Sequence, residues 1–386
     1  MKKFLTFLSY VLVAAIASVA TFGAVYIQQD QQFQASPKLQ QVLQLIEERF
    51  IGETDRTVLE DAAASAMIEA MGDRWSYYIS AKDYEAHMEQ MKNAYVGIGV
   101  TISPLEAGGF EITVVNPGGS AEEAGIQLGD VIVAVAGQSV LEMDTTACRD
   151  LVRGEEGTFV DITVKRGEQE LTLSVERKTV QTPVATGEML PANVGLVTIV
   201  NFDERCFDET VAAIEELLEQ GATSIIFDVR YNPGGYKTEL VKLLDYLLPE
   251  GDLFHSENYK GETSVDRSDA ACLDIPMAVI VNGSSYSAAE FFAAALSEYE
   301  AAITVGEKTT GKGHFQNTFL LSDGSAVAIS TGRYKTPKGV SLEGVGITPD
   351  VEVTVDEETA YYIYAGVLDP MEDPQILAAI DALKGK

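Results

Sequence analysis

The chain has 386 residues, of which 46% are hydrophobic and 22% charged, and its formal net charge is −32 at pH 7. This length and balance exclude a disordered or low-complexity chain and predict two or three globular domains, each with its own core. Acidic residues are spread along most of the sequence, and no cluster of lysine and arginine interleaves with aromatic residues, so we expect no nucleic-acid partner.

The three cysteines, Cys148, Cys206 and Cys272, are scattered through the sequence. They lack the CxxC or Cys/His spacing of a zinc site, and their odd number argues against a disulfide framework. We therefore expect all three to be small core residues.

The first 30 residues predict a membrane anchor or an export signal. Two lysines precede an uncharged apolar run over residues 4–27, which is about long enough to cross a bilayer as a helix. A cleaved signal peptide is the alternative, because residues 18–20 (SVA) offer a small-x-small site. We expect a single-pass protein of the cytoplasmic membrane whose remaining chain is extracytoplasmic, or a protein secreted after signal cleavage.

Residues 31–94 predict a helical region. LQQVLQLIEERF (39–50) and VLEDAAASAMIEAMG (58–72) carry apolar residues at helical spacing, and Gly72 is a natural helix stop. DRWSYYISAKDYEAHMEQM (73–91) holds the only tryptophan, a tyrosine pair and a further expected helix. We interpret this region as a packing arm or a dimerisation element.

A β-rich domain is expected over residues 95–178. Alternating apolar segments are bounded by glycine or proline, a short helix is expected near residues 121–124, and a hairpin turns at Arg166-Gly167. YVGIGV (95–100) and SAEEAGIQLGDVIVAVAGQSV (120–140) resemble a PDZ domain of the bacterial protease type.

The PDZ-like loop contains the candidate peptide-binding residues Val96, Gly97, Ile98 and Gly99. Its glycines let consecutive N–H groups converge on a peptide carboxylate, while the adjoining strand edge accepts an extended peptide as an added strand. Such a domain reads chain ends. A β-domain with glycine turns and no ligand is the alternative.

Residues 179–355 predict an α/β core. NVGLVTIVNF (193–202) and TSIIFDVR (223–230) read as strands, and the helical pattern between them implies a right-handed parallel crossover. The second strand leads into a turn containing Gly234 and Gly235. Backbone N–H groups at such a turn can hold an oxyanion, although on this pattern alone a tight structural turn is the better explanation of the glycines.

The next expected strand, IPMAVIVN (275–282), runs into a turn and a helix that together contain Ser284, Ser285 and Ser287. A strand, a sharp turn and a helix form the arrangement that exposes a nucleophile. Serine is also an ordinary residue for capping a helix, so the pattern alone does not choose between the two roles.

The proton acceptor for such a serine is the next question. Of the three histidines, only His314 lies near a plausible site. The same loop places Lys312 between two glycines, with Gln316 four positions on. A lysine in a poorly solvated site has a lowered pKa and can accept a hydroxyl proton, whereas a lysine on a solvated loop cannot.

Four motifs resemble, in their order, the carboxyl-terminal processing peptidases, the tail-specific serine proteases of family S41. They are DVRYNPGG, VNGSSYSAAE, VGEKTTGKGHFQ and RYKTPKGVSLEGVGITPDVEV. The resemblance implies a multi-domain α/β protein with a crotonase/ClpP-like core, in which Ser287 is the nucleophile, Lys312 the base and Gln316 the residue that holds the lysine. Lys312 follows Ser287 by 25 positions, as in the family motif.

The resemblance also implies an oxyanion hole formed by the N–H of Ala288 and that of Gly234 or Gly235, with no metal and no cofactor. Two residues depart from the family pattern, since Tyr286 replaces a small residue and Ala289 replaces a serine. The expected substrates are proteins or peptides with exposed C-termini.

The expected organisation has five parts: 1–30, 31–94, 95–178, 179–355 and a C-terminal helical segment, 356–386. The last segment contains DPQILAAIDALKG (373–385), which docking on the core or on a second subunit would both explain. Homodimerisation through this end and the arm is a hypothesis.

Several alternatives stay open from the sequence. A Ser/His/Asp hydrolase would use His314, and a catalytically inactive PDZ-containing scaffold or regulator would use no base at all. Glu290 suits the first turn of its helix, where its charge favours the helix dipole. Asp228 and Arg230 are expected to pair or cap rather than react.

Overall fold

A computed structural model describes residues 37–384, so the predicted anchor or signal segment, residues 1–30, lies outside the described residues. The chain divides into two compact units, Met1–Gly72 and Asp73–Lys386. Among residues 37–384, no helix is both long enough and apolar enough to cross a membrane.

The first unit contains α2 (Pro37–Arg49) and α3 (Arg56–Glu69), where the sequence predicts helices. The Asp55 carboxylate caps α3 by accepting from the N–H of Thr57 at 2.8 Å. Arg56 bridges the two helices through Glu47 at 3.2 Å. Neither helix buries any residue.

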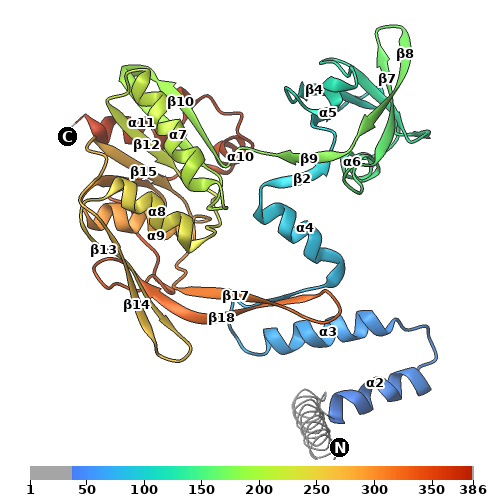
Figure 1. The fold of residues 1–386 in the computed structure, drawn as a ribbon, viewed down its shortest axis with the longest axis horizontal. Helices are drawn as coiled ribbons and strands as arrows, with labels where there is room; N and C mark the ends of the chain where they lie inside the picture. Colours follow the sequence, from blue (N-terminus) through green and yellow to red (C-terminus); the bar gives the residue numbers. More distant parts are fainter. Residues whose placement is uncertain (1–36, 385–386) are drawn as a thin grey trace, which may run out of the picture. The chain divides into compact units, whose positions relative to one another are not determined.

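The second unit is built around a six-stranded sheet in the order β10-β11-β12-β15-β16-β19 (Figure 1). All neighbours from β11 to β19 are parallel, and β10 is antiparallel at the edge. The strands are β10 (Ala185–Leu190), β11 (Val194–Ile199), β12 (Ser224–Asp228), β15 (Met277–Val281), β16 (Ala302–Gly306) and β19 (Val351–Glu352). The predicted α/β fold class is confirmed.

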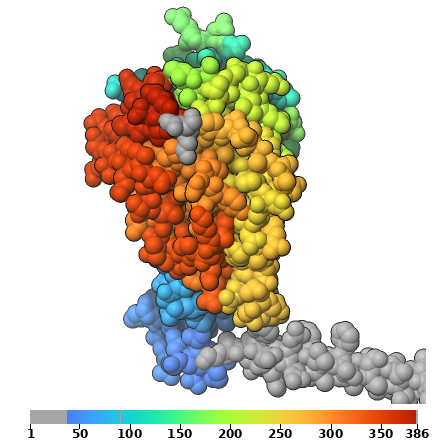
Figure 2. Space-filling model, turned by 90° about the vertical axis from the view of Figure 1, so that its left-hand side faces the viewer, coloured from blue at the N-terminus to red at the C-terminus, as the bar shows by residue number. Residues whose placement is uncertain are grey.

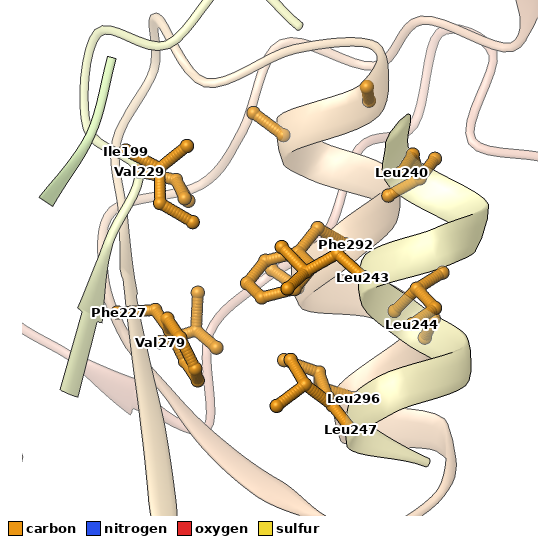
Figure 3. Packing of buried hydrophobic residues seen from close by; sticks show 14 of the residues in the cluster. Ile199, Phe227, Val229, Leu240, Leu243, Leu244, Leu247, Val279, Phe292 and Leu296 are labelled. Carbon is orange, nitrogen blue, oxygen red and sulfur yellow. The ribbon is translucent and has the colours of Figure 1, made fainter. Parts of the chain in front are cut away.

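Three helices, α7 (Cys206–Glu219), α8 (Lys237–Leu247) and α9 (Ala288–Glu298), pack on one face of this sheet. Figure 3 shows Leu243 and Leu247 of α8 and Phe292 of α9 pointing toward the strand residues Phe227 and Val279. The rings of Phe227 and Phe292 meet edge to face at 5.3 Å. This apolar layer fixes the start of α9, which follows the predicted nucleophile.

The C-terminal helix α11 (Pro374–Leu383) covers the opposite face of the sheet, where Ile376 and Ala379 are buried against strand residues such as Ile280. The C-terminal segment, drawn in red, is continuous with the orange parts of the core (Figure 2). Asp373 of the same segment pairs with the buried Arg230 at 2.7 Å. The described part of the segment therefore docks on its own core. Before α11, the segment contains α10 (Glu357–Tyr364) and η2 (Pro370–Glu372). A further short helix, η1 (Pro191–Asn193), connects β10 to β11.

A second, antiparallel sheet carries the lysine loop. It contains β1 (Tyr77–Ile79), β13 (Gly251–Asn258), β14 (Thr263–Ser268), β17 (His314–Leu320) and β18 (Ala326–Lys335). The expectation of a helical region over 31–94 is wrong at residues 77–79, which pair with β18. Two tyrosines and a buried isoleucine suit a strand that is half covered by a core. The expected helix follows as α4 (Ala81–Met91).

The β-rich domain consists of strands and two short helices, as the sequence predicts. Its sheet runs in the order β3-β4-β5-β7-β8, so β3 is an edge strand. At the predicted hairpin, the Asp130 carboxylate forms an ion pair with Arg166, with 2.7 Å between Oδ1 and Nε. The elements are β3 (Val100–Pro104), β4 (Phe110–Val115), α5 (Ser120–Glu123), β5 (Val131–Val135), β6 (Gln138–Ser139), α6 (Thr145–Val152), β7 (Phe159–Arg166) and β8 (Gln169–Glu176). β2 (Ala94–Gly97) and β9 (Lys178–Gln181) pair with each other where the chain enters and leaves the domain.

The cysteines follow the expectation in part. Cys148 and Cys206 are buried, but Cys272 is exposed in the coil between β14 and β15. A cysteine in a polar connecting segment has no core to enter, so composition alone misplaces it.

Candidate active site

Ser287 occupies an unusual backbone conformation between the end of β15 and the start of α9. Its φ is 59° and its ψ is −123°, and its side chain makes no capping hydrogen bond to the helix. A residue other than glycine in such a region costs about 1–3 kcal/mol, and such residues cluster at functional sites. The capping role that the sequence left open therefore does not account for Ser287.

Ser285, by contrast, has a structural role. Its buried hydroxyl donates to the carbonyl oxygen of Val229 at 2.8 Å and accepts from the N–H of Asn282 at 3.0 Å. Ser284 is exposed, and its N–H donates to the side chain of Asn282 at 3.1 Å. These two serines form the turn that carries Ser287.

The glycine turn after β12 lies directly against Ser287. A Cβ added to Gly234, whose φ is +89°, would lie 2.7 Å from the backbone nitrogen of Ala288 and 2.7 Å from the Cβ of Ser287. Only a glycine allows this approach. The turn thus brings backbone donors from two loops to one place.

The two glycines of this turn differ as hydrogen-bond donors. The Gly234 N–H donates to the side-chain oxygen of Asn232 at 2.8 Å, so it is already used. Within residues 37–384, neither the Gly235 N–H nor the Ala288 N–H has an acceptor. Of the predicted oxyanion donors, the structure therefore leaves Gly235 and Ala288 available and not Gly234.

A buried carboxylate shapes the lysine loop. Glu290 is 0% exposed and accepts hydrogen bonds from the N–H groups of Gly311 at 2.7 Å and Lys312 at 2.9 Å. It also accepts from the hydroxyl of Thr309. Burial raises the pKa of Glu290, and these three donors act in the opposite direction. The expected structural role holds, but its main contacts are with the loop, which helix-dipole reasoning missed.

The Lys312 side chain lies between aromatic rings. Its Nζ is 5.0 Å from the centre of the Trp75 ring and 5.8 Å from that of Tyr286. Loss of hydration lowers the pKa of Lys312 to about 8, while the carboxylates of Glu343 and Asp73 act in the opposite direction. The lysine is therefore of the poorly solvated kind that a general base requires.

The contacts expected for a serine, lysine and glutamine triad are not formed directly. Within residues 37–384, no hydrogen bond joins Nζ of Lys312 to Ser287 or to Gln316. The Gln316 amide instead donates to the carbonyl oxygen of His314 at 3.2 Å and to the hydroxyl of Ser330 at 3.0 Å. The Lys312 amine instead lies close to the Trp75 and Tyr286 rings.

Tyr334 is a site residue that the sequence did not single out. It is buried, and its hydroxyl donates to the carbonyl oxygen of Lys312. Burial raises the pKa of Tyr334, and the neighbouring hydroxyl of Ser287 acts in the opposite direction. The phenol thus lies beside both predicted catalytic residues. It sits on β18, and no sequence spacing links that strand to the turn before α9.

Comparison with known proteins identifies the family. The family models for peptidase family S41 and for the PDZ domain match residues 193–353 and 111–166. The chain is 31% identical over 325 residues to the carboxy-terminal processing protease CtpA of Bacillus subtilis, covering 83% of this chain and 69% of that protein. The chain belongs to the carboxyl-terminal processing peptidases of family S41.

Other relatives define the extent of the likeness. A protein of Staphylococcus epidermidis named "Probable CtpA-like serine protease" is 32% identical over 323 residues, which cover 82% of this chain and 65% of that protein. This S41 peptidase thus spans about two thirds of the length of that relative. A solved structure named "Putative S41 protease from Bacteroides fragilis" has a TM-score of 0.55 at 17% identity, covers 92% of this chain and 98% of that one, and shares the fold.

His314 of this S41 peptidase has its own carboxylate partner. Its Nδ1 lies 3.0 Å from the Glu343 carboxylate, which also accepts from the N–H of Gly313 at 2.6 Å. In the described part of the chain, His314 makes no hydrogen bond to Ser287. The alternative His314 base thus has an orienting partner but no direct contact with the serine.

The predicted peptide loop of the PDZ domain is fixed at its centre. The carbonyl oxygen of Ile98 accepts from the N–H of Ala121 at 3.0 Å, and that of Gly99 accepts from Asn116 at 2.9 Å. Val96 and Gly97 lie in β2, and the edge strand β3 begins directly after Gly99. A peptide added beside β3 would therefore begin at the loop.

Metal-ligating side chains do not gather in the described region. Within residues 37–384, no group of three or more His, Cys, Asp or Glu side chains is placed to hold a metal ion.

The Asp228 and Arg230 side chains form the expected ion pair, with 2.5 Å between Oδ2 of Asp228 and Nη2 of Arg230.

Proposed function

We propose that the protein is an extracytoplasmic serine endopeptidase that recognises C-terminal tails through its PDZ domain and cleaves by an acyl-enzyme mechanism. The observation that carries the proposal is the backbone of Ser287, held at a φ of 59° beside free N–H groups of two loops. Membership of the S41 family and the half-buried Lys312, whose pKa is lowered to about 8, support the same reaction class.

In the proposed reaction the Ser287 hydroxyl attacks the scissile carbonyl carbon, and its proton passes to the neutral amine of Lys312. The protonated lysine then gives a proton to the leaving amine. Water attacks the acyl-enzyme with Lys312 again as base, and the ester bond to Ser287 breaks. The Lys312 side chain must turn from the aromatic rings toward Ser287 for the first step, with Gln316 as the residue that then holds it.

The tetrahedral intermediate carries a negative charge on the former carbonyl oxygen. We assign the N–H groups of Ala288 and Gly235 as its donors, because both are free and Gly234 is committed to Asn232. Removing one such donor typically costs about 100- to 1000-fold in rate. Binding of a tail to the PDZ loop of Val96, Gly97, Ile98 and Gly99 would favour the state in which these groups act together.

The proposed location rests on the sequence alone. The apolar run over residues 4–27 would anchor the protein in the cytoplasmic membrane with its catalytic domain outside, or be cleaved as a signal. Homodimerisation is proposed because α2 and α3 bury no residue and expose apolar side chains. The exposed residues include Val42, Leu45, Val58 and Met67.

One observation favours a second function. Because no hydrogen bond joins Ser287 to Lys312 in the described chain, a catalytically inactive PDZ-containing scaffold or regulator is the alternative. Such a protein binds tails without cleaving them, so cleavage assays separate the two functions.

The first prediction concerns the substrate tail. A model protein that ends in a flexible apolar tail with a free carboxylate should be cleaved at least about tenfold more efficiently than the same protein with an amidated C-terminus, since charged hydrogen bonds contribute about 1.5–3 kcal/mol. The measurement is kcat/KM by mass spectrometry of the products. Equal cleavage of both substrates would show that the PDZ loop does not recognise the C-terminal carboxylate.

The second prediction concerns pH. The neutral amine of Lys312 is the base, so kcat/KM should rise with pH, about tenfold between pH 6 and 7, and level off above the pKa of about 8. Activity falls at lower pH because protonation of Lys312 removes the base. Lys312→Arg should be inactive throughout, because arginine stays charged. An acid limb that disappears in His314→Ala and persists in Lys312→Arg would instead identify the histidine as the base.

A further inference from the structure

Two aromatic residues from distant parts of the sequence meet at the Lys312 amine. The Trp75 and Tyr286 rings stack with their centres 5.9 Å apart and their planes 25° apart. The lysine Nζ lies within 6 Å of both ring centres, at 5.0 and 5.8 Å. Tyr286 directly precedes Ser287, so the two rings form an aromatic wall beside the amine and next to the nucleophile.

Trp75 is held firmly in its place. Its indole N–H donates to Oε1 of Glu343 at 3.1 Å, and its backbone N–H donates to Asp73 at 3.2 Å. The next residue, Ser76, donates to Asp73 and accepts from the N–H of Ser330 at 3.0 Å. Strand β1 follows and pairs with β18. The indole is therefore a fixed part of the lysine's surroundings.

We propose that Trp75 is a positioning residue for Lys312. The indole of Trp75, together with the Tyr286 ring, keeps water away from the lysine amine. The proposal deepens the proposed function, because it rests on Lys312 as the base. Trp75 does not touch the reacting atoms and acts through the lysine.

Two effects of the rings on the amine oppose each other. A ring face attracts the ammonium, which favours the charged form. Removing water disfavours the charged form and is the largest influence on the pKa of Lys312. Exclusion of water is the larger effect, in agreement with the lowered pKa of Lys312.

Other charged and titratable groups also surround this site. Glu343 and Asp73 favour the charged lysine, and the Arg74 guanidinium lies 4.0 Å from the centre of the Trp75 ring. The remaining groups are Glu290, which accepts from the Lys312 N–H, His314, which pairs with Glu343, and the Tyr334 phenol, which donates to the Lys312 carbonyl oxygen. A substitution at Trp75 removes two of these contacts, because Glu343 loses the indole donor and Arg74 loses the ring that it lies over.

The test compares Trp75→Ala and Trp75→Phe in the full-length protein. Trp75→Ala admits water to the amine, so the acid limb of kcat/KM should move up by about one pH unit, giving about tenfold less activity at pH 7 and near-wild-type activity above pH 9. Trp75→Phe keeps a ring but loses the hydrogen bond to Glu343, so the acid limb of its kcat/KM profile should move less than that of Trp75→Ala. Tyr259→Ala is the matched control, because Lys260 lies 5.6 Å from the centre of that exposed ring.

A second readout does not need cleavage. The pH dependence of Lys312 dinitrophenylation, followed by mass spectrometry in a Ser287→Ala background, reports the lysine directly. Its midpoint should lie below the ordinary pKa of a lysine side chain and rise by about one unit in Trp75→Ala. An unchanged or lowered midpoint would overturn the proposal, as would a pH-independent loss of activity. A shifted midpoint in a protein that cleaves nothing would refute the proposed function and leave this inference standing.

Discussion

Replacing Ser287 by alanine is expected to lower tail-dependent cleavage by at least about a thousandfold, as the loss of a serine nucleophile does in other enzymes. The variant keeps the backbone donors of Gly235 and Ala288 but has no oxygen to attack the substrate. Its fold should stay intact, because the Ser287 side chain makes no capping hydrogen bond. Cleavage rates and a thermal unfolding curve measure the two effects separately.

Ser284→Ala is the matched control for this substitution. Ser284 lies three positions earlier in the same turn and is exposed, so its variant should cleave within about twofold of wild type, as is usual for surface substitutions. A serine-directed fluorophosphonate should label the wild type and Ser284→Ala at Ser287 and leave Ser287→Ala unlabelled. Undiminished cleavage by Ser287→Ala would refute the proposed nucleophile, and a lack of cleavage by every form would favour the scaffold.

The fold was open to prediction because its signals are local. Continuous apolar runs mark the buried parallel strands, and glycine or proline marks their ends, as for the strand that ends at Asp228. Residues 77–79 show the limit of this reasoning. They follow two helices in sequence, yet they join β18, which lies some 250 positions later and which no local pattern connects to them.

The candidate site was predictable to the same extent. The motifs identify Ser287 and Lys312 as candidates, but they do not give the direction of a lysine side chain, which depends on the packing of Trp75 and Tyr286. Nor do they distinguish Gly234 from Gly235 as a donor, since that difference depends on the side chain of Asn232. Contacts between distant segments are the information that a single sequence lacks.

Glu290→Gln is expected to lower kcat/KM by about 10- to 100-fold, equivalent to about 1.4–2.7 kcal/mol of transition-state stabilisation. Both oxygens of Glu290 accept, Oε1 from Thr309 and Gly311 and Oε2 from Lys312. An amide presents one oxygen and one NH₂ group, so in either orientation a donor meets a donor. The loop that carries Lys312 then loses part of its anchor, and the lysine its position.

Glu298→Gln separates this effect from a general loss of helix contacts. Glu298 lies at the other end of α9 and likewise accepts from a threonine hydroxyl, that of Thr336, and from a backbone N–H, that of Lys338. It touches neither Ser287 nor Lys312, so its variant should lose less than about threefold in kcat/KM, even where unfolding shifts by about 1 kcal/mol. Equal losses in both variants would show that Glu290 stabilises α9 without positioning the base, whereas a loss confined to Glu290→Gln ties the serine helix to the lysine loop through one buried carboxylate.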